Sequence, residues 1–281
     1  MIRLNMYGWN DRLNQLKQES AYNTLSHGRI AIVHRTCYEV VSESGLYQCE
    51  LTGNMMYGKS DFELPCTGDW VLFQPFDDSK GIIVGMLPRE RTLYRKRNGT
   101  VAGKQAIASY VDKAFIVQSL DDNFNMRRVE RFMVQILEEN IHPVLILNKA
   151  DLPFDKQETE EAIRHLTCRM PVFFTSIHHP ETVSRLRDSI SEGETVVFVG
   201  SSGVGKSSLV NALCERSVLQ TSDISQSTGK GRHTSTRREM VLMDSSGVLI
   251  DTPGIREFGL TVDNPDSLAE MLEISNYAES C

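Results

Sequence analysis

The most informative residues of the sequence form a phosphate-binding loop. Residues 200–207 read GSSGVGKS, a full match to the pattern G-x-x-x-x-G-K-S, between an apolar run and a helix expected to open at Lys206. Glycines in this pattern let backbone N–H groups turn toward the β-phosphate, and the helix N-terminus adds a favourable dipole. We expect Lys206 to reach the β- and γ-phosphates and to support catalysis, and the Ser207 hydroxyl to ligate Mg²⁺. The predicted phosphate-loop residues are Gly200, Ser201, Ser202, Gly203, Val204, Gly205, Lys206, Ser207 and Ser208.

An acidic residue follows this loop at the end of a second apolar run. Asp251 comes directly after GVLI (residues 247–250) and opens the string DTPG. An aspartate in this position holds Mg²⁺, here through water, and the backbone N–H of Gly254 can then meet the γ-phosphate. The string alone also fits an ordinary turn. Its place after the phosphate loop favours a switch that senses the γ-phosphate.

A third string, NKAD at Asn148–Asp151, has the residue types that recognise guanine. Asp151 can accept hydrogen bonds from N1–H and the exocyclic amine of guanine, a donor pair that adenine does not present. Lys149 is expected to pack its stem along the base plane, and Asn148 to tie the loop to its neighbours. Ala150 completes this predicted base loop.

A second base loop is expected after the apolar run 171–175, where Ser176 would meet the base O6 through its backbone. Alanine is usual after this serine, and Ile177 stands there instead. Both base loops precede the phosphate loop, whereas in an ordinary GTPase they follow it. The sequence therefore predicts a circularly permuted GTPase domain, a rearrangement that is sterically reasonable because the termini of compact domains often lie close together.

The catalytic water has no obvious partner in the sequence. Many GTPases carry a water-orienting glutamine after Asp-x-x-Gly, and this position is Ile255, which cannot polarise water. His233, in the stretch GRHTST, is a candidate for positioning the water, while a solvent-exposed loop histidine and an RNA contact are equally good interpretations. Thr234 or Thr236 of the same stretch could close on Mg²⁺.

The elements that position these residues are predicted in two parts. Between residues 29 and 87, short apolar runs alternate with Gly, Asp and Ser clusters, a pattern typical of a five-stranded OB-type β-barrel, although SH3-like barrels have similar patterns. An amphipathic lead-in with Leu13 and Leu16 precedes it. The barrel strands are expected at 29–35, 38–42, 46–51, 69–74 and 81–87.

From about residue 105 strands and helices alternate, which indicates a parallel sheet with crossover helices, so the fold class is all-β followed by α/β. One helix, capped by Asn123 or Asn125, carries apolar residues at helical spacing from Val129 to Leu137. Two more helices are expected at 157–167 and over Val183–Ile190. The predicted strands are 113–119, 142–147, 171–175, 195–199, 239–243 and 247–250.

Composition narrows the class of protein further. With 40% hydrophobic and 24% charged residues, no apolar run long enough for a membrane span and no signal-peptide pattern, we expect a cytoplasmic protein without membrane contact. The six cysteines include no C-x-x-C pair, which favours reduced thiols, buried for the first five. They are Cys37, Cys49, Cys66, Cys168, Cys214 and Cys281.

The net charge of −7 argues against general nucleic-acid binding, but two stretches are basic. Residues 89–104 hold six basic residues and one acid, and residues 230–238 hold four basic residues and no acid. Each stretch is either a solvated surface or an RNA contact.

Together these motifs resemble the ribosome small subunit-dependent GTPase A family, circularly permuted bacterial GTPases of 30S maturation. The resemblance covers nearly the whole chain and implies an OB-fold, a permuted GTPase domain, a C-terminal zinc-binding domain, cleavage of GTP to GDP and phosphate stimulated by the 30S subunit, and contact with 16S rRNA. It rests on GRIAIVHR, PCTGDWV, MLPRERTLYRK, residues 105–112, DDNFNMRRVERF, LNKADL, GSSGVGKSSLVNAL, GRHTST and DTPGIREFGL.

The resemblance also implies domain boundaries. We expect an N-terminal extension at 1–27, the barrel at 28–104, the GTPase domain at 105–262 and the beginning of the zinc-binding domain at 263–281. The sequence stops at Cys281, which the resemblance makes the first zinc ligand, and one thiol cannot form a four-ligand site. We therefore expect a fragment cut inside the third domain, without bound zinc and with a frayed C-terminus.

Two functional hypotheses follow. In the first, the chain is a monomeric GTPase that assembles on the 30S subunit and holds rRNA through the barrel and the basic stretches. In the second, it is an RNA-binding assembly module in which GTP is mainly a conformational ligand, a hypothesis that Ile255 keeps open.

Overall fold

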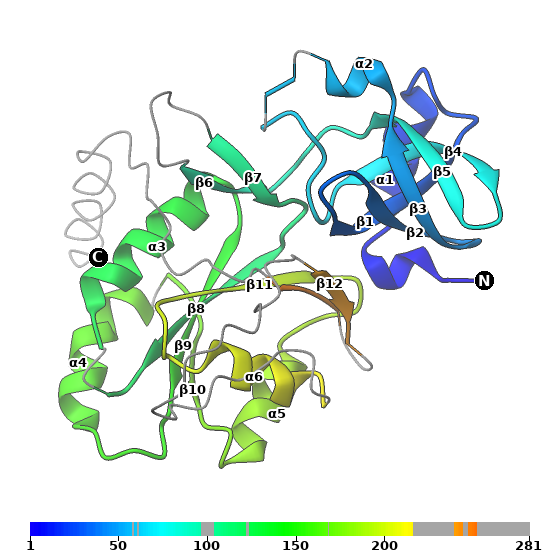
Figure 1. The fold of residues 1–281 in the computed structure, drawn as a ribbon. Coiled ribbons are helices and arrows are strands. Elements are labelled where there is room, and N and C mark those ends of the chain that lie inside the picture. Colours follow the sequence, from blue (N-terminus) through cyan, green and yellow to red (C-terminus); the bar gives the residue numbers. More distant parts are fainter. Residues whose placement is uncertain are drawn as a thin grey trace, which may run out of the picture.

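The structure is a computed structural model of the chain and consists of a β-barrel followed by an α/β domain (Figure 1). Bound to the barrel is an N-terminal segment with the short helices η1 (Leu4–Tyr7) and α1 (Asp11–Glu19). Among the described residues, no helix is long and apolar enough to cross a membrane. Those residues are 1–57, 59–60, 62–96, 104–121, 124–167, 169–215, 239–243 and 247–251.

Five strands close the barrel in the order β1-β2-β3-β5-β4, and β4 returns to β1. The parallel pairing of β3 with β5 and the return to β1 give the strand arrangement of an OB-fold, so the expected five-stranded barrel is confirmed. The helix α2 (Gly53–Met56) lies between β3 and β4. The strands are β1 (Ser26–Val33), β2 (Tyr38–Ser42), β3 (Gly45–Leu51), β4 (Trp70–Asp77) and β5 (Lys80–Met86).

The barrel interior is filled by the apolar residues of alternate strand positions. Ile30, Val40, Cys49, Phe73 and Ile83 are fully buried in one cluster. Strands with one buried face place successive side chains on opposite sides, which explains why these residues alternate with polar ones along the sequence.

A two-stranded hairpin follows the barrel. It consists of β6 (Leu93–Lys96) and β7 (Lys104–Ala108), which pair antiparallel. The sequence patterns did not predict this hairpin, because its short strands acquire their order from pairing and from packing against the α/β domain.

The sheet of the α/β domain has the order β10-β9-β8-β11-β13-β12. Its strands are parallel except β12, which runs antiparallel to β13. The near-continuous apolar runs of the inner strands β8, β9, β11 and β13 are buried, as parallel sheets covered on both faces require. The strands are β8 (Lys113–Ser119), β9 (His142–Asn148), β10 (Val172–Thr175), β11 (Thr195–Val199), β12 (Glu239–Leu242) and β13 (Val248–Asp251).

In the part of the chain that the structure describes, four helices cover this sheet. α3 and α4 pack on one face and α5 and α6 on the other (Figure 1). Of the two expected caps for α3, the structure has Asn125, whose side chain accepts a hydrogen bond from the Arg128 N–H. The helices are α3 (Met126–Glu138), α4 (Lys156–Thr167), α5 (Pro180–Asp188) and α6 (Lys206–Leu213).

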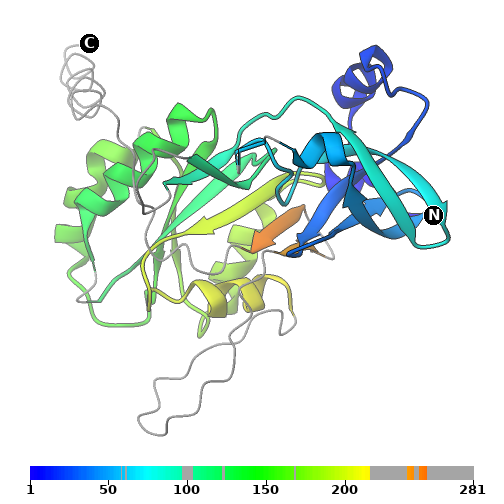
Figure 2. The same ribbon diagram turned by 45° about the horizontal axis from the view of Figure 1, so that its top comes forward.

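The barrel lies beside the β12 edge of the α/β domain (Figure 2). β1 pairs antiparallel with β12 at Ile32 and Glu239, so one continuous sheet runs through both parts. The guanidinium of Arg29, also in β1, is fully buried where the parts meet.

The cysteines in the described ranges are free thiols. Cys49, Cys66 and Cys214 are buried as expected, whereas Cys37 is only half-buried because it precedes β2 at the edge of the barrel. Burial raises the pKa of the Cys49 thiol to about 12, which keeps it protonated. Cys168 and Cys281 lie outside the described residues.

Candidate nucleotide-binding site

Asn148 joins the predicted base loop to the phosphate loop. It is the last residue of β9 and is buried. Its amide nitrogen donates to the Val204 carbonyl oxygen at 2.8 Å, and its amide oxygen accepts from the Thr175 hydroxyl at 3.1 Å. One side chain thus connects three loops at the carboxyl ends of β9, β10 and β11, where ligands bind in open α/β sheets.

Lys149 is held by an acidic residue that lies outside the predicted base and phosphate loops. Its ammonium lies 2.7 Å from a carboxylate oxygen of Asp121, which follows β8. The backbone of Lys149 has a φ of 62°, in the left-handed region. The Ala150 N–H donates to the Thr175 carbonyl at 3.0 Å, which ties this turn to the second base loop.

Asp151 is the exposed acceptor of the base loop. The Ser176 hydroxyl donates to its Oδ1 at 2.5 Å and itself accepts from the His178 N–H at 3.1 Å. The hydrogen bond from Ser176 holds the pKa of Asp151 below its usual range, with a smaller contribution from His178. The carboxylate is therefore ionised and oriented, the state in which it accepts two hydrogen bonds from a guanine.

The backbone of Ser176 has a different partner from the expected one. Its N–H donates to the Thr182 hydroxyl at 3.0 Å, so this group is engaged inside the loop, and its contact with a base O6 stays a prediction. The Thr182 contact arises because α5 begins directly after the loop, and its first turn folds back on Ser176. The neighbouring Ile177 lines the base cavity instead.

A cavity of about 230 Å³ lies between the two base loops and the start of α6. Leu152 and His178 belong to its walls and were missed in the sequence, because they directly follow the two motifs and carry no motif chemistry of their own. The lining residues are Asn148, Lys149, Asp151, Leu152, Ile177, His178, Gly205 and Ser208.

The phosphate loop has the backbone that its glycines permit. Gly200, Gly203 and Gly205 all have φ values between 83° and 149°, in or near the left-handed region. A Cβ on Gly200 would lie 2.3 Å from the Val117 carbonyl oxygen, so the loop passes directly against β8. Lys206 is the first residue of α6, and its ammonium donates to the carbonyls of Gly200 and Ser201 at 2.7 and 2.5 Å.

Several predicted site residues lie outside the part of the chain that the structure describes. Asp251 ends β13 beside β11, but its side chain is outside that part. No group of three or more His, Cys, Asp and Glu that could hold a metal ion occurs among the described residues. The whole basic stretch 230–238 also lies outside the described residues. The predicted site residues outside are His233, Thr234, Thr236, Gly254, Ile255 and Cys281.

The other basic stretch is partly used for internal contacts. The Arg89 guanidinium pairs with the buried Asp69 at 2.6 Å and also donates to the carbonyls of Phe62 and Leu64. Arg89 therefore holds the segment before β4 against the barrel. Its charge is compensated by Asp69, which weakens the case for an RNA contact at this residue.

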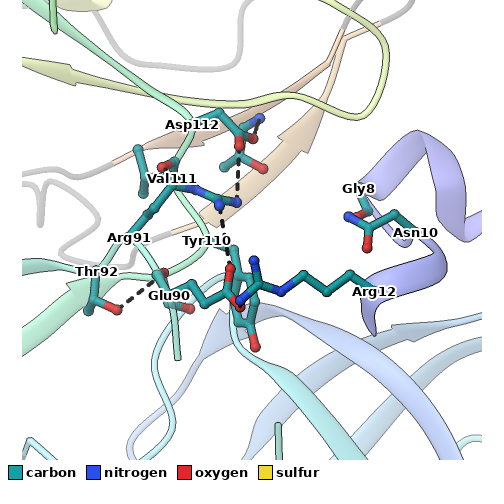
Figure 3. Close-up of polar contacts among 12 residues, drawn as sticks. Gly8, Asn10, Arg12, Glu90, Arg91, Thr92, Tyr110, Val111 and Asp112 are labelled. Atoms are coloured by element: carbon teal, nitrogen blue, oxygen red, sulfur yellow. Dashed lines mark hydrogen bonds and ion pairs between the residues drawn. The ribbon is translucent and has the colours of Figure 1, made fainter. Parts of the chain in front are cut away.

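A second cavity, of about 330 Å³, lies where the N-terminal helices, the barrel and the α/β domain meet. Figure 3 shows that the charged residues there face one another. Arg12 pairs with Glu90 at 2.7 Å, and Arg91 pairs with Asp112 at 3.1 Å. These pairs join the three parts of the molecule. Within the basic stretch 89–104, the charges of both Arg89 and Arg91 are therefore paired with acidic residues of the chain.

The geometry thus combines a phosphate loop, a base loop on the preceding strands and a barrel. The sequence model described as RsgA GTPase matches residues 86–261 of the chain. A relative from Bacteroides thetaiotaomicron named small ribosomal subunit biogenesis GTPase RsgA 1 is 72% identical over 278 residues, covering 99% of this chain and 78% of that protein. The chain belongs to the RsgA GTPase family.

A second RsgA relative, from Methanosarcina acetivorans, is 39% identical and covers 99% of this chain and 74% of its own. Among solved structures, YjeQ from Thermotoga maritima superposes with a TM-score of 0.64 at 23% identity, covering 84% of this chain and 77% of that one. YloQ, described as a circularly permuted GTPase, gives 0.59 at 24% identity, with coverage of 86% and 76%. These two structures show the fold, a barrel followed by a circularly permuted GTPase domain.

Membership of the RsgA GTPase family makes the chain a GTPase that binds GTP. The expected permuted order is confirmed, because the base loops of β9 and β10 precede the phosphate loop of β11 in the chain, while β8 lies between β9 and β11 in one parallel sheet.

Proposed function

We propose that the chain hydrolyses GTP as a factor in small ribosomal subunit biogenesis, with the nucleotide held between the base loops and the phosphate loop. The observation that carries this assignment is the bridge from Asn148 to Val204, which brings the base-reading and phosphate-binding strings into one site. The 72% identity to a small ribosomal subunit biogenesis GTPase supports the same function.

Different residues are proposed to bind the base and the phosphates. Asp151 accepts from the two guanine donors, and Lys149 covers the base plane. The base O6 is assigned to the N–H of Ile177, since the Ser176 N–H is engaged with Thr182. The ammonium of Lys206, which now donates to loop carbonyls, transfers to the β- and γ-phosphates when they occupy the loop.

Mg²⁺ fits the donor set at the start of α6. We propose that Ser207 holds it directly and Asp251 through water, with Thr234 or Thr236 as a further ligand and His233 orienting the water that attacks. The ion would neutralise charge on the β- and γ-phosphate oxygens. For zinc, we propose Cys281 as one ligand of a Cys/His site.

The proposed partners are the 30S subunit and its 16S rRNA. We propose that the protein binds them as a monomer in the cytoplasm. The proposed domain boundaries are those given by the resemblance, with the barrel at 28–104 and the GTPase domain at 105–262. The barrel strands observed at residues 26–86 begin slightly before the first of these ranges and end inside it.

The deciding experiment is GTP turnover by the full chain with and without purified 30S subunits. We expect stimulation by about tenfold or more, because the position of the water-orienting glutamine is Ile255 and a partner must complete the site. Lys206→Ala is the control and should abolish turnover in both arms. Unchanged turnover in the presence of 30S subunits that the protein binds would instead favour an RNA-binding assembly module with GTP as a conformational ligand.

A further inference from the structure

The chain segment that follows β8 lies between the two nucleotide-binding loops. β8 pairs with β9 on one side and with β11 on the other, and the three strands are parallel. Their carboxyl ends therefore meet at one edge of the sheet. The base loop leaves β9 and the phosphate loop leaves β11 at this edge, so the segment after β8 adjoins both loops.

Asp121 connects this segment to the base loop. One of its oxygens lies 2.7 Å from Lys149 Nζ, and the other accepts from the Ser119 hydroxyl at 2.6 Å. The Leu120 N–H donates to the Asn148 carbonyl at 2.9 Å. A residue with a side chain adopts the left-handed conformation of Lys149 at a cost, which surrounding contacts must offset. The ion pair with Asp121 is such a contact.

Arg128 connects the same segment to the phosphate loop. It lies in the first turn of α3, and its Nη1 donates to the Ser201 hydroxyl at 3.1 Å. The Asn125 cap fixes the start of α3 and with it the base of the Arg128 side chain. A guanidinium is charged at every physiological pH, so Arg128 adds positive potential beside the loop that receives the phosphates.

We propose that Asp121 and Arg128 are positioning residues for the GTPase reaction, Asp121 acting through Lys149 on the base and Arg128 through Ser201 on the phosphates. The proposal rests on the assignment of Asn148–Asp151 and Gly200–Ser208 as the nucleotide-binding loops. Both residues come from a segment that carries neither of these motifs.

The two contacts act on different ends of the nucleotide and are separable by measurement. Loss of the Asp121 contact loosens the cover over the base plane, which guanine and hypoxanthine share. Loss of the Arg128 contact lowers the positive potential beside the phosphates, which affects a triphosphate more than a diphosphate because the triphosphate carries more negative charge.

The first test measures the Kd of fluorescent GDP and IDP with the full chain. Asp121→Asn should weaken both nucleotides by the same factor, about fivefold. Asp188→Asn, at an exposed position on α5, removes the same charge and should leave both values unchanged. Asp151→Asn is the reference for the base itself and should shift preference from GDP toward XDP.

The second test compares the Kd of GDP with that of a non-hydrolysable GTP analogue, and measures kcat and KM for GTP. Arg128→Gln should weaken the analogue about threefold more than GDP and lower kcat, while the GDP-to-IDP ratio stays constant. Arg128→Lys keeps the charge and should restore the analogue-to-GDP ratio. Arg127→Gln, at the exposed neighbouring position, is the matched control.

The outcomes separate this proposal from the proposed function. If the unmodified chain binds GDP and Asp151→Asn shifts it toward XDP, the loops are correctly assigned; unchanged affinities and kcat in the Asp121 and Arg128 variants would then overturn the positioning role. Equal loss of every nucleotide together with a lower melting temperature in Arg128→Lys would also overturn it, since that result indicates a purely structural contact. Absence of GDP binding in the unmodified chain would overturn the proposed function itself.

Discussion

At the scale of single residues, the Ser176 hydroxyl sets the state of Asp151. It donates to the carboxylate at 2.5 Å, while the His178 N–H donates to Ser176 and strengthens it as part of a chain. A hydrogen bond to the charged form of an acid favours ionisation, which is why the pKa of Asp151 lies below its usual range. The carboxylate that we propose as the acceptor for guanine is therefore held in its ionised form by Ser176.

Ser176→Ala should raise the pKa of Asp151 toward its ordinary value. Guanine binding needs the ionised carboxylate, so affinity is present above the pKa of Asp151 and is lost as pH falls through it. In the variant this loss should begin at higher pH, with GDP about threefold weaker at neutral pH from the less ordered carboxylate. Carboxylate ¹³C NMR titration and GDP affinity against pH measure both effects. Ser184→Ala, on the exposed side of α5, should leave both curves in place.

At the scale of elements, the close approach of β9 to the phosphate loop depends on a glycine. Gly205 precedes α6 with a φ of 91°, and a Cβ there would lie 2.4 Å from the Asn148 amide nitrogen. That amide donates to the Val204 carbonyl, so the bridge between the loops exists only because position 205 has no side chain.

Gly205→Ala should break this bridge and strain the loop. We expect the free energy of unfolding to fall by about 1–3 kcal/mol, because the residue is forced into a left-handed conformation and Asn148 loses a partner. GDP affinity should fall at least tenfold more than the stability change explains. Gly53→Ala, where a Cβ meets nothing within 4 Å, is the control and should be neutral or slightly stabilising. Urea unfolding and GDP titration test both, and full GDP affinity in Gly205→Ala would contradict the role of the bridge.

Much of the element pattern was predictable because it depends on local periodicity. The apolar stripe of α3 and the continuous apolar runs of β8, β9 and β11 gave their positions within a few residues. The partners of Arg89, Lys149 and the Ser176 N–H were not predictable, because each partner is brought near only by the folded chain. The motifs locate the site, and the folded structure supplies the residues that orient it.

At the scale of the whole molecule, Arg29 joins the barrel to the α/β domain. Its guanidinium donates to acceptors in the N-terminal segment, the barrel and the α/β domain. They are the carbonyls of Tyr7, Gly68, Ser109 and Tyr110 and the hydroxyl of Thr195. Burial lowers the pKa of Arg29 to about 10, so it remains charged at neutral pH. A charge buried with this many acceptors holds the parts in one arrangement.

Arg29→Met tests that role, because methionine fills space but leaves the acceptors without a donor. The free energy of unfolding should fall by about 3 kcal/mol. Both tryptophans of the chain report the junction, since Trp9 and Trp70 lie 4.9 Å apart and Arg29 lies over the Trp70 ring at 5.5 Å. Tryptophan fluorescence should therefore change at lower urea than far-UV circular dichroism, which follows all helices and strands. Arg35→Met, at an exposed position after β1, is the control and should leave the two transitions coincident. Coincident and unshifted transitions in Arg29→Met would show that the barrel and the α/β domain are held together without Arg29.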